Sequence, residues 1–167
     1  MKRNTLVFAV AVLAVLGFSL AYILGSRPQT GVKPGDKVPD LEIPSVEEGN
    51  TIHLQDYRGR VLILDFLAPW CGPCREQVDH LRVVERLEGV EVVSVNIDPS
   101  YGLEDLRGFK EEEGITWFLG HSPQAGFEFQ VSAIPTTIVV DQEGVIRYRG
   151  FFTSASDLKH IVEGLVG

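Results

Sequence analysis

Residues 61–74 read VLILDFLAPWCGPC and contain both cysteines of the chain. The apolar, β-branched first half of this stretch, interrupted only by Asp65, predicts a buried central strand. Pro73 suits the first position of a helix, where its missing N–H is not needed. The pattern therefore predicts a strand that ends before Cys71 and a helix that begins beside it, with Cys74 in the first helical turn.

The predicted place of Cys71 at a helix start favours its ionised form. Unpaired backbone N–H groups and the helix dipole stabilise an anion there, and the thiolate is the nucleophile in disulfide exchange. A free thiol has a pKa of about 8.5, and helix-start cysteines in Cys-X-X-Cys motifs fall to about 3.5–7.5. Cys74 is near enough in sequence to attack a mixed disulfide formed on Cys71. The pair can thus carry two electrons.

Two other interpretations of the cysteine pair are weaker. A structural disulfide across a two-residue loop would remove little chain entropy. A zinc site would need two further ligands at compatible spacing, but the four histidines are scattered and form no second paired motif. The acidic run Glu111–Glu113 is interpreted as a solvated helix end. We therefore expect a redox dithiol, with no metal and no other cofactor.

Residues 70–74, Trp-Cys-Gly-Pro-Cys after an apolar strand, resemble the active site of thioredoxins. Asp65 stands six residues before the first cysteine, at the position of that family's buried aspartate. Residues 134–136, Ile-Pro-Thr, resemble its cis-proline segment. The resemblance spans most of residues 33–167 and implies an α/β thioredoxin fold.

The same resemblance implies roles for single residues. Cys71 and Cys74 would be the catalytic pair and would form the redox-active disulfide. Asp65 would be a buried acid with a raised pKa that takes a proton from Cys74 as this thiol attacks the mixed disulfide; the alternative is a polar residue bonded to backbone at the strand end. A cis proline leaves the preceding backbone free to pair with an extended substrate. The expected substrate-binding residues are Trp70, Gly72, Pro73, Ile134 and Pro135.

The rest of the soluble part resembles the extracytoplasmic TlpA/ResA-like relatives of thioredoxin. Residues 40–46 and 51–54 predict an N-terminal edge β-hairpin, an opening that is also similar to that of peroxiredoxins. A helix over about 103–113 and a strand over 116–119 form the central insertion typical of the TlpA/ResA group, and residues 123–130 supply a further short helix.

The remaining predicted elements complete a mixed sheet flanked by helices. The active-site helix extends to about residue 87, and a second central strand follows over 91–97. Strands over 138–141 and 145–148 flank a turn, and Ser156 is the expected cap of the last helix. The aromatic residues expected to fill the core are Trp117, Phe118, Phe127 and Phe129.

Three positions depart from the families that the chain resembles. Ser94 stands where thioredoxins carry a lysine near the buried acid, and Gln77 stands where ResA-like members carry a glutamate. Both changes are expected to alter the pKa values of the buried acid and of the cysteine thiol. Asp79 replaces a helix-kinking proline and predicts a straighter active-site helix.

Residues 1–24 are expected to lie outside the fold, as an N-terminal transmembrane signal anchor. Lys2 and Arg3 precede an uncharged run that ends at Leu24; as a helix it would span about 28 Å, close to the roughly 30 Å hydrocarbon core. The positive flank predicts a cytoplasmic N-terminus and a domain facing outward. A cleaved signal peptide is the alternative, because residues 19–21 resemble a cleavage site.

Residues 25–35 contain several Gly, Pro and Ser residues and are expected to form a flexible tether. The thioredoxin-like domain is expected over residues 36–167. With 15 Lys and Arg against 23 Asp and Glu, the formal net charge is −8. No basic patch or stripe appears in the sequence, which argues against nucleic acid as a partner.

The predicted activity is reduction of protein disulfides, because Gly-Pro between the cysteines resembles the reducing thioredoxins. Apocytochrome c is a frequent target in this family, since haem attachment requires both of its thiols reduced. An outward-facing reductase needs electrons from inside, so a membrane thiol-electron carrier is the expected reductant.

Two other functions stay open from the sequence. One is a peroxiredoxin-like thiol peroxidase with antioxidant activity, although Ala68 stands where those enzymes carry a threonine. The other is a binding or chaperone module that uses the proline groove without redox turnover.

Overall fold

The structure is a computed structural model that describes residues 13 and 28–166. Its main sheet has five strands in the order β5-β4-β3-β6-β7, and every residue of the central strand β3 is buried. Strand β4 is parallel to β3 and β5 is parallel to β4, whereas β6 is antiparallel to β3 and β7 to β6. The bounds are β3 Val61–Leu67, β4 Val90–Asn96, β5 Phe118–His121, β6 Thr136–Val140 and β7 Ile146–Gly150.

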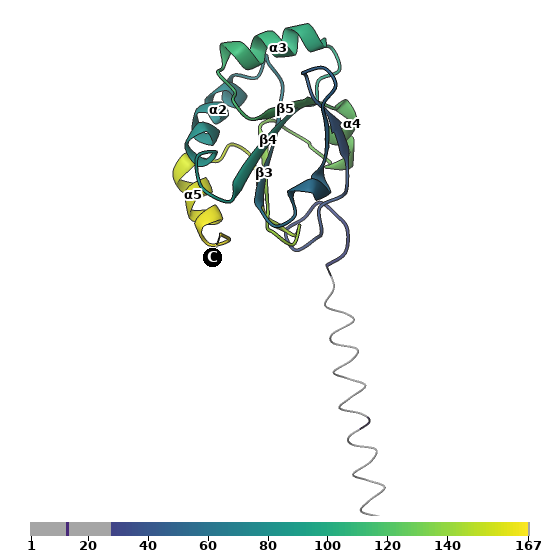
Figure 1. Ribbon diagram of the computed structural model, residues 1–167, viewed down its shortest axis with the longest axis vertical. Helices are drawn as coiled ribbons and strands as arrows, with labels where there is room; N and C mark the ends of the chain where they lie inside the picture. Colours follow the sequence, from purple (N-terminus) through teal and green to yellow (C-terminus); the bar gives the residue numbers. More distant parts are fainter. Residues whose placement is uncertain (1–12, 14–27, 167) are drawn as a thin grey trace, which may run out of the picture.

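Helices and a small hairpin cover the two faces of this sheet (Figure 1). The helices α2 (Gly72–Val84), α3 (Leu103–Glu112) and α5 (Ala155–Glu163) supply buried side chains to one core. The other core is closed by α4, the 3-10 helix η1 and the two-stranded antiparallel sheet β1-β2. Their bounds are α4 Pro123–Glu128, η1 Leu54–Tyr57, β1 Glu42–Pro44 and β2 Thr51–His53. This is the predicted α/β thioredoxin-like fold with its N-terminal hairpin.

The alternation along β3 decides which face carries the acid. Ile63 and Leu67 belong to the core under α2 and α5, and Leu64 and Phe66 belong to the opposite core. Successive side chains of a strand point to opposite faces. Asp65 therefore lies on the α2 side, the same side as both cysteines.

Some predicted boundaries differ from the structure. Helix α2 ends at Val84, because the chain leaves the helix through Glu85 and turns at Gly89, whose φ of +76° favours glycine. The last helix is capped by Ser154, whose side chain accepts the N–H of Asp157. The predicted cap, Ser156, lies inside that helix.

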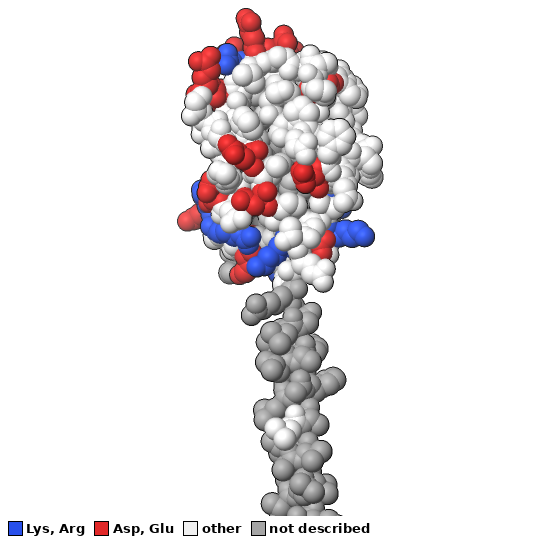
Figure 2. Space-filling view, turned by 90° about the vertical axis from the view of Figure 1, so that its right-hand side faces the viewer, with Lys and Arg blue, Asp and Glu red and all other residues white. Residues whose placement is uncertain are grey.

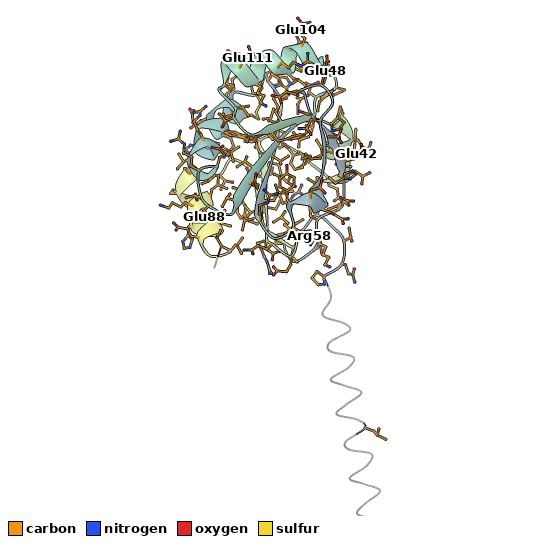
Figure 3. All side chains as sticks on the ribbon, viewed as in Figure 1. Glu42, Glu48, Arg58, Glu88, Glu104 and Glu111 are labelled. Atoms are coloured by element: carbon orange, nitrogen blue, oxygen red, sulfur yellow. A yellow bond between two sulfur atoms is a disulfide. The ribbon has the colours of Figure 1, made fainter. Side chains whose placement is uncertain are left out.

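One expectation for an aromatic side chain is corrected, and the solvated acidic run gains contacts that the sequence did not predict. Phe127 is 77% exposed, whereas Trp117 and Phe129 are buried as predicted. Ala125 and Phe129, four residues apart, face the core from α4 and its C-cap, so Phe127 lies on the opposite side of the helix. In the acidic run, Glu111 projects from α3 (Figure 3), but the next two carboxylates pair with a cation of α2, as described below.

The described part of the predicted tether packs against the domain. Val32 is buried in the core that α4, η1 and the β1-β2 hairpin close. The N–H of Gly31 donates to the carbonyl of Lys37, and the N–H of Gly35 donates to the carbonyl of Ile146. Residues 29–35 therefore belong to the packed domain, because this burial and these hydrogen bonds fix them to it.

The predicted anchor, residues 1–24, lies outside the described residues apart from Leu13. Within the described part of the chain, no helix has the length and apolar character needed to cross a membrane. On the face shown in Figure 2, a broad uncharged surface separates scattered acidic side chains, and Lys and Arg side chains gather toward one end of the domain.

Candidate active site

The two cysteines form a disulfide at the start of α2. Cys71 is the N-cap residue, Pro73 lies in the first turn, and the backbone N–H of Cys74 donates to Cys71 Sγ over 3.2 Å. Cys71 is 4% exposed and Cys74 is 0% exposed. The sulfur that borders the surface is therefore the one that receives a backbone N–H from the helix start.

The cis-proline segment lies against this sulfur. The Ile134–Pro135 peptide bond is cis, and the carbonyl oxygen of Ile134 lies 3.8 Å from Cys71 Sγ. Pro135 is followed directly by β6, the neighbour of β3 in the sheet. The structure thus brings together two segments that are more than sixty residues apart in sequence.

A groove of about 600 Å³ opens beside Cys71. Trp70 lies on one side of it with 65% of its surface exposed. Other lining residues are Gly72, Pro73, Ile97, Val131, Ala133 and Ile134. The groove is mostly apolar and open to solvent.

The indole of Trp70 is held in place by a carboxylate. Its Nε1 donates to Asp98 Oδ2 over 2.7 Å, and Asp98 also accepts hydrogen bonds from the hydroxyl and the N–H of Ser100. The Ser100 hydroxyl and N–H, and then Trp70, lower the pKa of Asp98 below its ordinary value. Asp98 therefore fixes one wall of the groove, a role that the sequence analysis did not predict.

Asp65 is completely buried beneath this site. Its Oδ2 accepts a hydrogen bond of 3.1 Å from Ser94 Oγ, which in turn accepts one of 2.9 Å from Trp117 Nε1. Burial raises the pKa of Asp65 to about 7, and the Ser94 hydrogen bond acts in the opposite direction. Trp117 was expected only to fill the core, and its polar contact was missed.

Gln77 is a second buried polar residue whose partner the sequence did not show. Its Nε2 donates to the carbonyl of Thr153 over 2.9 Å, and its Oε1 accepts the N–H of Thr153 over 2.7 Å. The side chain thereby bonds the first half of α2 to the connection between β7 and α5. A glutamate at this position could not make both bonds in its ionised form.

Helix α2 is also joined to α3 by charge. Arg75 pairs with Glu112 and Glu113 and lies over the ring of Phe109, with its Cζ 5.1 Å from the ring centre. The acidic end of α3 is thus partly neutralised by the helix that carries the cysteines. Among the residues that the structure describes, no three side chains of the metal-binding types are grouped to hold an ion.

Comparisons with known proteins agree with this geometry. The Redoxin family profile matches residues 33–159. The thiol-disulfide oxidoreductase ResA of Geobacillus kaustophilus is 28% identical over 155 residues, covering 87% of each chain.

Solved structures with the same fold include a thiol:disulfide interchange protein DsbE from Chlorobium tepidum, with a TM-score of 0.70, 26% identity and coverage of 82% of this chain and 100% of that one. A secreted thiol-disulfide isomerase from Corynebacterium glutamicum has a TM-score of 0.72 at 26% identity, covering 82% of this chain and 90% of that one.

Proposed function

The chain belongs to the Redoxin family and is a thiol–disulfide oxidoreductase, and from this premise we propose that it reduces disulfides of proteins outside the cytoplasm. The observation that carries the proposal is the placement of Cys71 Sγ, which receives a helix N–H and borders an open apolar groove. Such a sulfur is suited to attack a disulfide in a polypeptide.

The proposed reaction has two exchanges. The Cys71 thiolate attacks one sulfur of the substrate disulfide, a mixed disulfide forms, and the first substrate sulfur leaves as a thiolate that takes a proton from water. Cys74 then loses its proton and attacks Cys71 Sγ. This step forms the Cys71–Cys74 disulfide and releases the second substrate sulfur, so the substrate gains the two electrons that the dithiol loses.

We assign the proton of Cys74 to Asp65. This carboxyl lies on the same side of the sheet as the cysteine pair, and its pKa of about 7 suits a group that alternates between the two protonation states near neutral pH. Cys74 is completely buried, so water has little access to its proton. Asp65, buried on the same face of the sheet, then accepts the proton that solvent water cannot reach.

The groove is the proposed binding site for the substrate chain. Trp70, Gly72 and Pro73 line it beside the cysteines, and Ile134 lines it from the cis-proline segment. Pro135 is buried behind Ile134 and sets its backbone through the cis peptide bond. A backbone carbonyl next to the reactive sulfur can pair with an extended segment, as in strand addition. Apocytochrome c fits this class of substrate, because a disulfide between its two haem-binding cysteines must be reduced to thiols before haem is attached.

We place the catalytic domain outside the cytoplasmic membrane, with residues 1–24 as the anchor; the domain includes residues 29–35, which pack against it, as well as the expected range 36–167. Support comes from the long uncharged run behind Lys2 and Arg3. In this location the oxidised pair must be reduced again, and a membrane thiol-electron carrier is the proposed donor.

The test is capture of the substrate by the full-length Cys74→Ser variant, which can form the mixed disulfide but cannot resolve it. We expect disulfide-linked proteins on Cys71, identified by mass spectrometry, among them proteins with a Cys-X-X-Cys pair. The matched control is the Cys71→Ser, Cys74→Ser double variant, which should capture none. Capture of small-molecule thiols alone would refute a protein substrate.

A further inference from the structure

Three buried side chains form a hydrogen-bonded chain that ends on the proposed proton acceptor. Trp117 Nε1 donates to Ser94 Oγ over 2.9 Å, and Ser94 Oγ donates to Asp65 Oδ2 over 3.1 Å. Trp117 is 7% exposed, and both other residues are 0% exposed. Trp117 immediately precedes β5, so it comes from the segment inserted between β4 and β6 rather than from the strands that carry the acid.

Donor and acceptor chemistry gives this chain a direction. An indole N–H can only donate, and a serine hydroxyl has one proton with two lone pairs. Because the Ser94 oxygen accepts from Trp117, its own proton is left to be donated, and Asp65 is the acceptor within reach. An ionised carboxylate only accepts, so the chain is complete when Asp65 is charged. A protonated Asp65 still accepts this bond at Oδ2 when its proton lies on Oδ1, but a hydrogen bond to the charged carboxylate is stronger, so the Ser94 donor favours the ionised form.

Among the described residues, no charged side chain contributes to the pKa of Asp65. Burial raises the pKa of Asp65, and the Ser94 hydrogen bond is the opposing influence. The adjacent strands contribute Ser94 from β4 and Thr137 from β6, neither of which ionises near neutral pH. The buried side chains of α3 and α5 on this face are apolar, and α2 adds the neutral Gln77 and Cys74, which titrates only when reduced.

We propose that Trp117 is a positioning residue of this active site: through Ser94 it keeps a hydrogen-bond donor aimed at Asp65 and so limits how tightly the buried carboxyl holds its proton. The inference rests on the proposed role of Asp65. A carboxyl that is already protonated at the working pH cannot accept the Cys74 proton, so the donor chain keeps the acceptor available.

The test is the titration of Asp65 in the oxidised full-length protein, followed by carboxyl ¹³C NMR. Ser94→Ala removes the direct donor and should raise the midpoint by about one to two pH units, the size expected for loss of a hydrogen bond to a charged group. Trp117→Phe keeps an aromatic ring and removes the N–H. It should raise the midpoint by about half a unit, because it weakens the chain without breaking its last bond.

The double variant separates a hydrogen-bond relay from a packing effect. If Trp117 acts through Ser94, Trp117→Phe should add no shift in the Ser94→Ala background. Trp70→Phe is the matched control, since the chain has two tryptophans and Trp70 donates to Asp98 instead; it should leave the Asp65 midpoint in place. The proposal would be overturned if Trp117→Phe alone left the Asp65 midpoint unchanged. It would also be overturned if Trp117→Phe shifted the midpoint as much in the Ser94→Ala background as in the wild type.

A second substitution guards against a folding defect. Site-specific replacement of Trp117 by β-(3-benzothienyl)alanine keeps the bicyclic shape and exchanges the N–H for sulfur, and it should reproduce the Trp117→Phe shift. An unshifted midpoint in this variant would also overturn the proposal. The titration involves no thiol exchange, so its result does not depend on whether Asp65 accepts the Cys74 proton. The Asp65→Asn variant tests that kinetic role, as described below.

Discussion

Asp65 and Thr137 are partners across β3 and β6, and each has a buried side-chain oxygen, Oδ1 and Oγ1 respectively, without a hydrogen-bond partner among the described residues. Burying an ionised carboxylate with incomplete hydrogen bonding is costly. The fold therefore holds Asp65 at the expense of stability, as expected for a group retained for its chemistry.

This cost predicts how stability depends on pH. The pKa of Asp65 rises from 3.8 to about 7 on folding, mainly through burial, so between these values the folded protein binds one proton more than the unfolded chain. The free energy of unfolding should therefore fall as pH rises from about 4 to about 7, by on the order of 4 kcal/mol from this group, and then level off.

The Asp65→Asn variant tests this directly, because it removes the ionisable group and keeps the shape. Its free energy of unfolding in urea should exceed that of the wild type by a few kcal/mol at about pH 8, and the difference should vanish near pH 4. An equal difference at both pH values would show that the side chain is not titrating in the folded protein.

The same variant should slow the second exchange and leave the first one unchanged. Stopped-flow reduction of a protein disulfide should show normal formation of the mixed disulfide, and resolution by Cys74 slowed by about 10²-fold, the lower range for loss of a general base. Resolution at the wild-type rate would remove Asp65 from the mechanism.

Gln77 predicts a pH-dependent defect in an isosteric variant. In Gln77→Glu the ionised carboxylate would face the carbonyl of Thr153 that the amide now satisfies, so stability should drop by about 1–3 kcal/mol at neutral pH. The loss should diminish in acid, where a protonated glutamic acid can donate again. The exposed neighbour supplies the control, and Glu76→Gln should unfold like the wild type in the same urea titration.

Asp98 should influence protein substrates more than small ones. Asp98→Ala releases the Trp70 indole from its 2.7 Å hydrogen bond and loosens one wall of the groove. KM for a protein disulfide should rise several-fold, while turnover of a small aromatic disulfide, which needs the cysteine pair but little of the groove, should stay within about twofold. Equal losses for both substrates would indicate a general disturbance of the cysteine pair.

Local patterns in the sequence were enough for the central strand, the helix start at Cys71 and the hairpin, because each rests on side-chain periodicity or on residues adjacent in the chain. Partners distant in sequence were not accessible in this way. The bond from Trp117 to Ser94 joins residues 23 apart, and that from Gln77 to Thr153 joins residues 76 apart. Neither pair has a local motif.

A local rule can also select the wrong neighbour. Ser156 was the expected cap, but the extended backbone at Ser154, with ψ of 156°, makes Ser154 the cap. The exposure of Phe127 likewise depends on which side of a six-residue helix meets the sheet. Tertiary packing settles both.

The most direct test of the whole account is the pH dependence of alkylation of the reduced full-length protein, with the modified cysteine identified by mass spectrometry. The account predicts that Cys71 reacts first and that its reactivity appears well below the range of an ordinary free thiol, about 8.5. Reaction that begins only in that range, or that falls equally on Cys74, would contradict it.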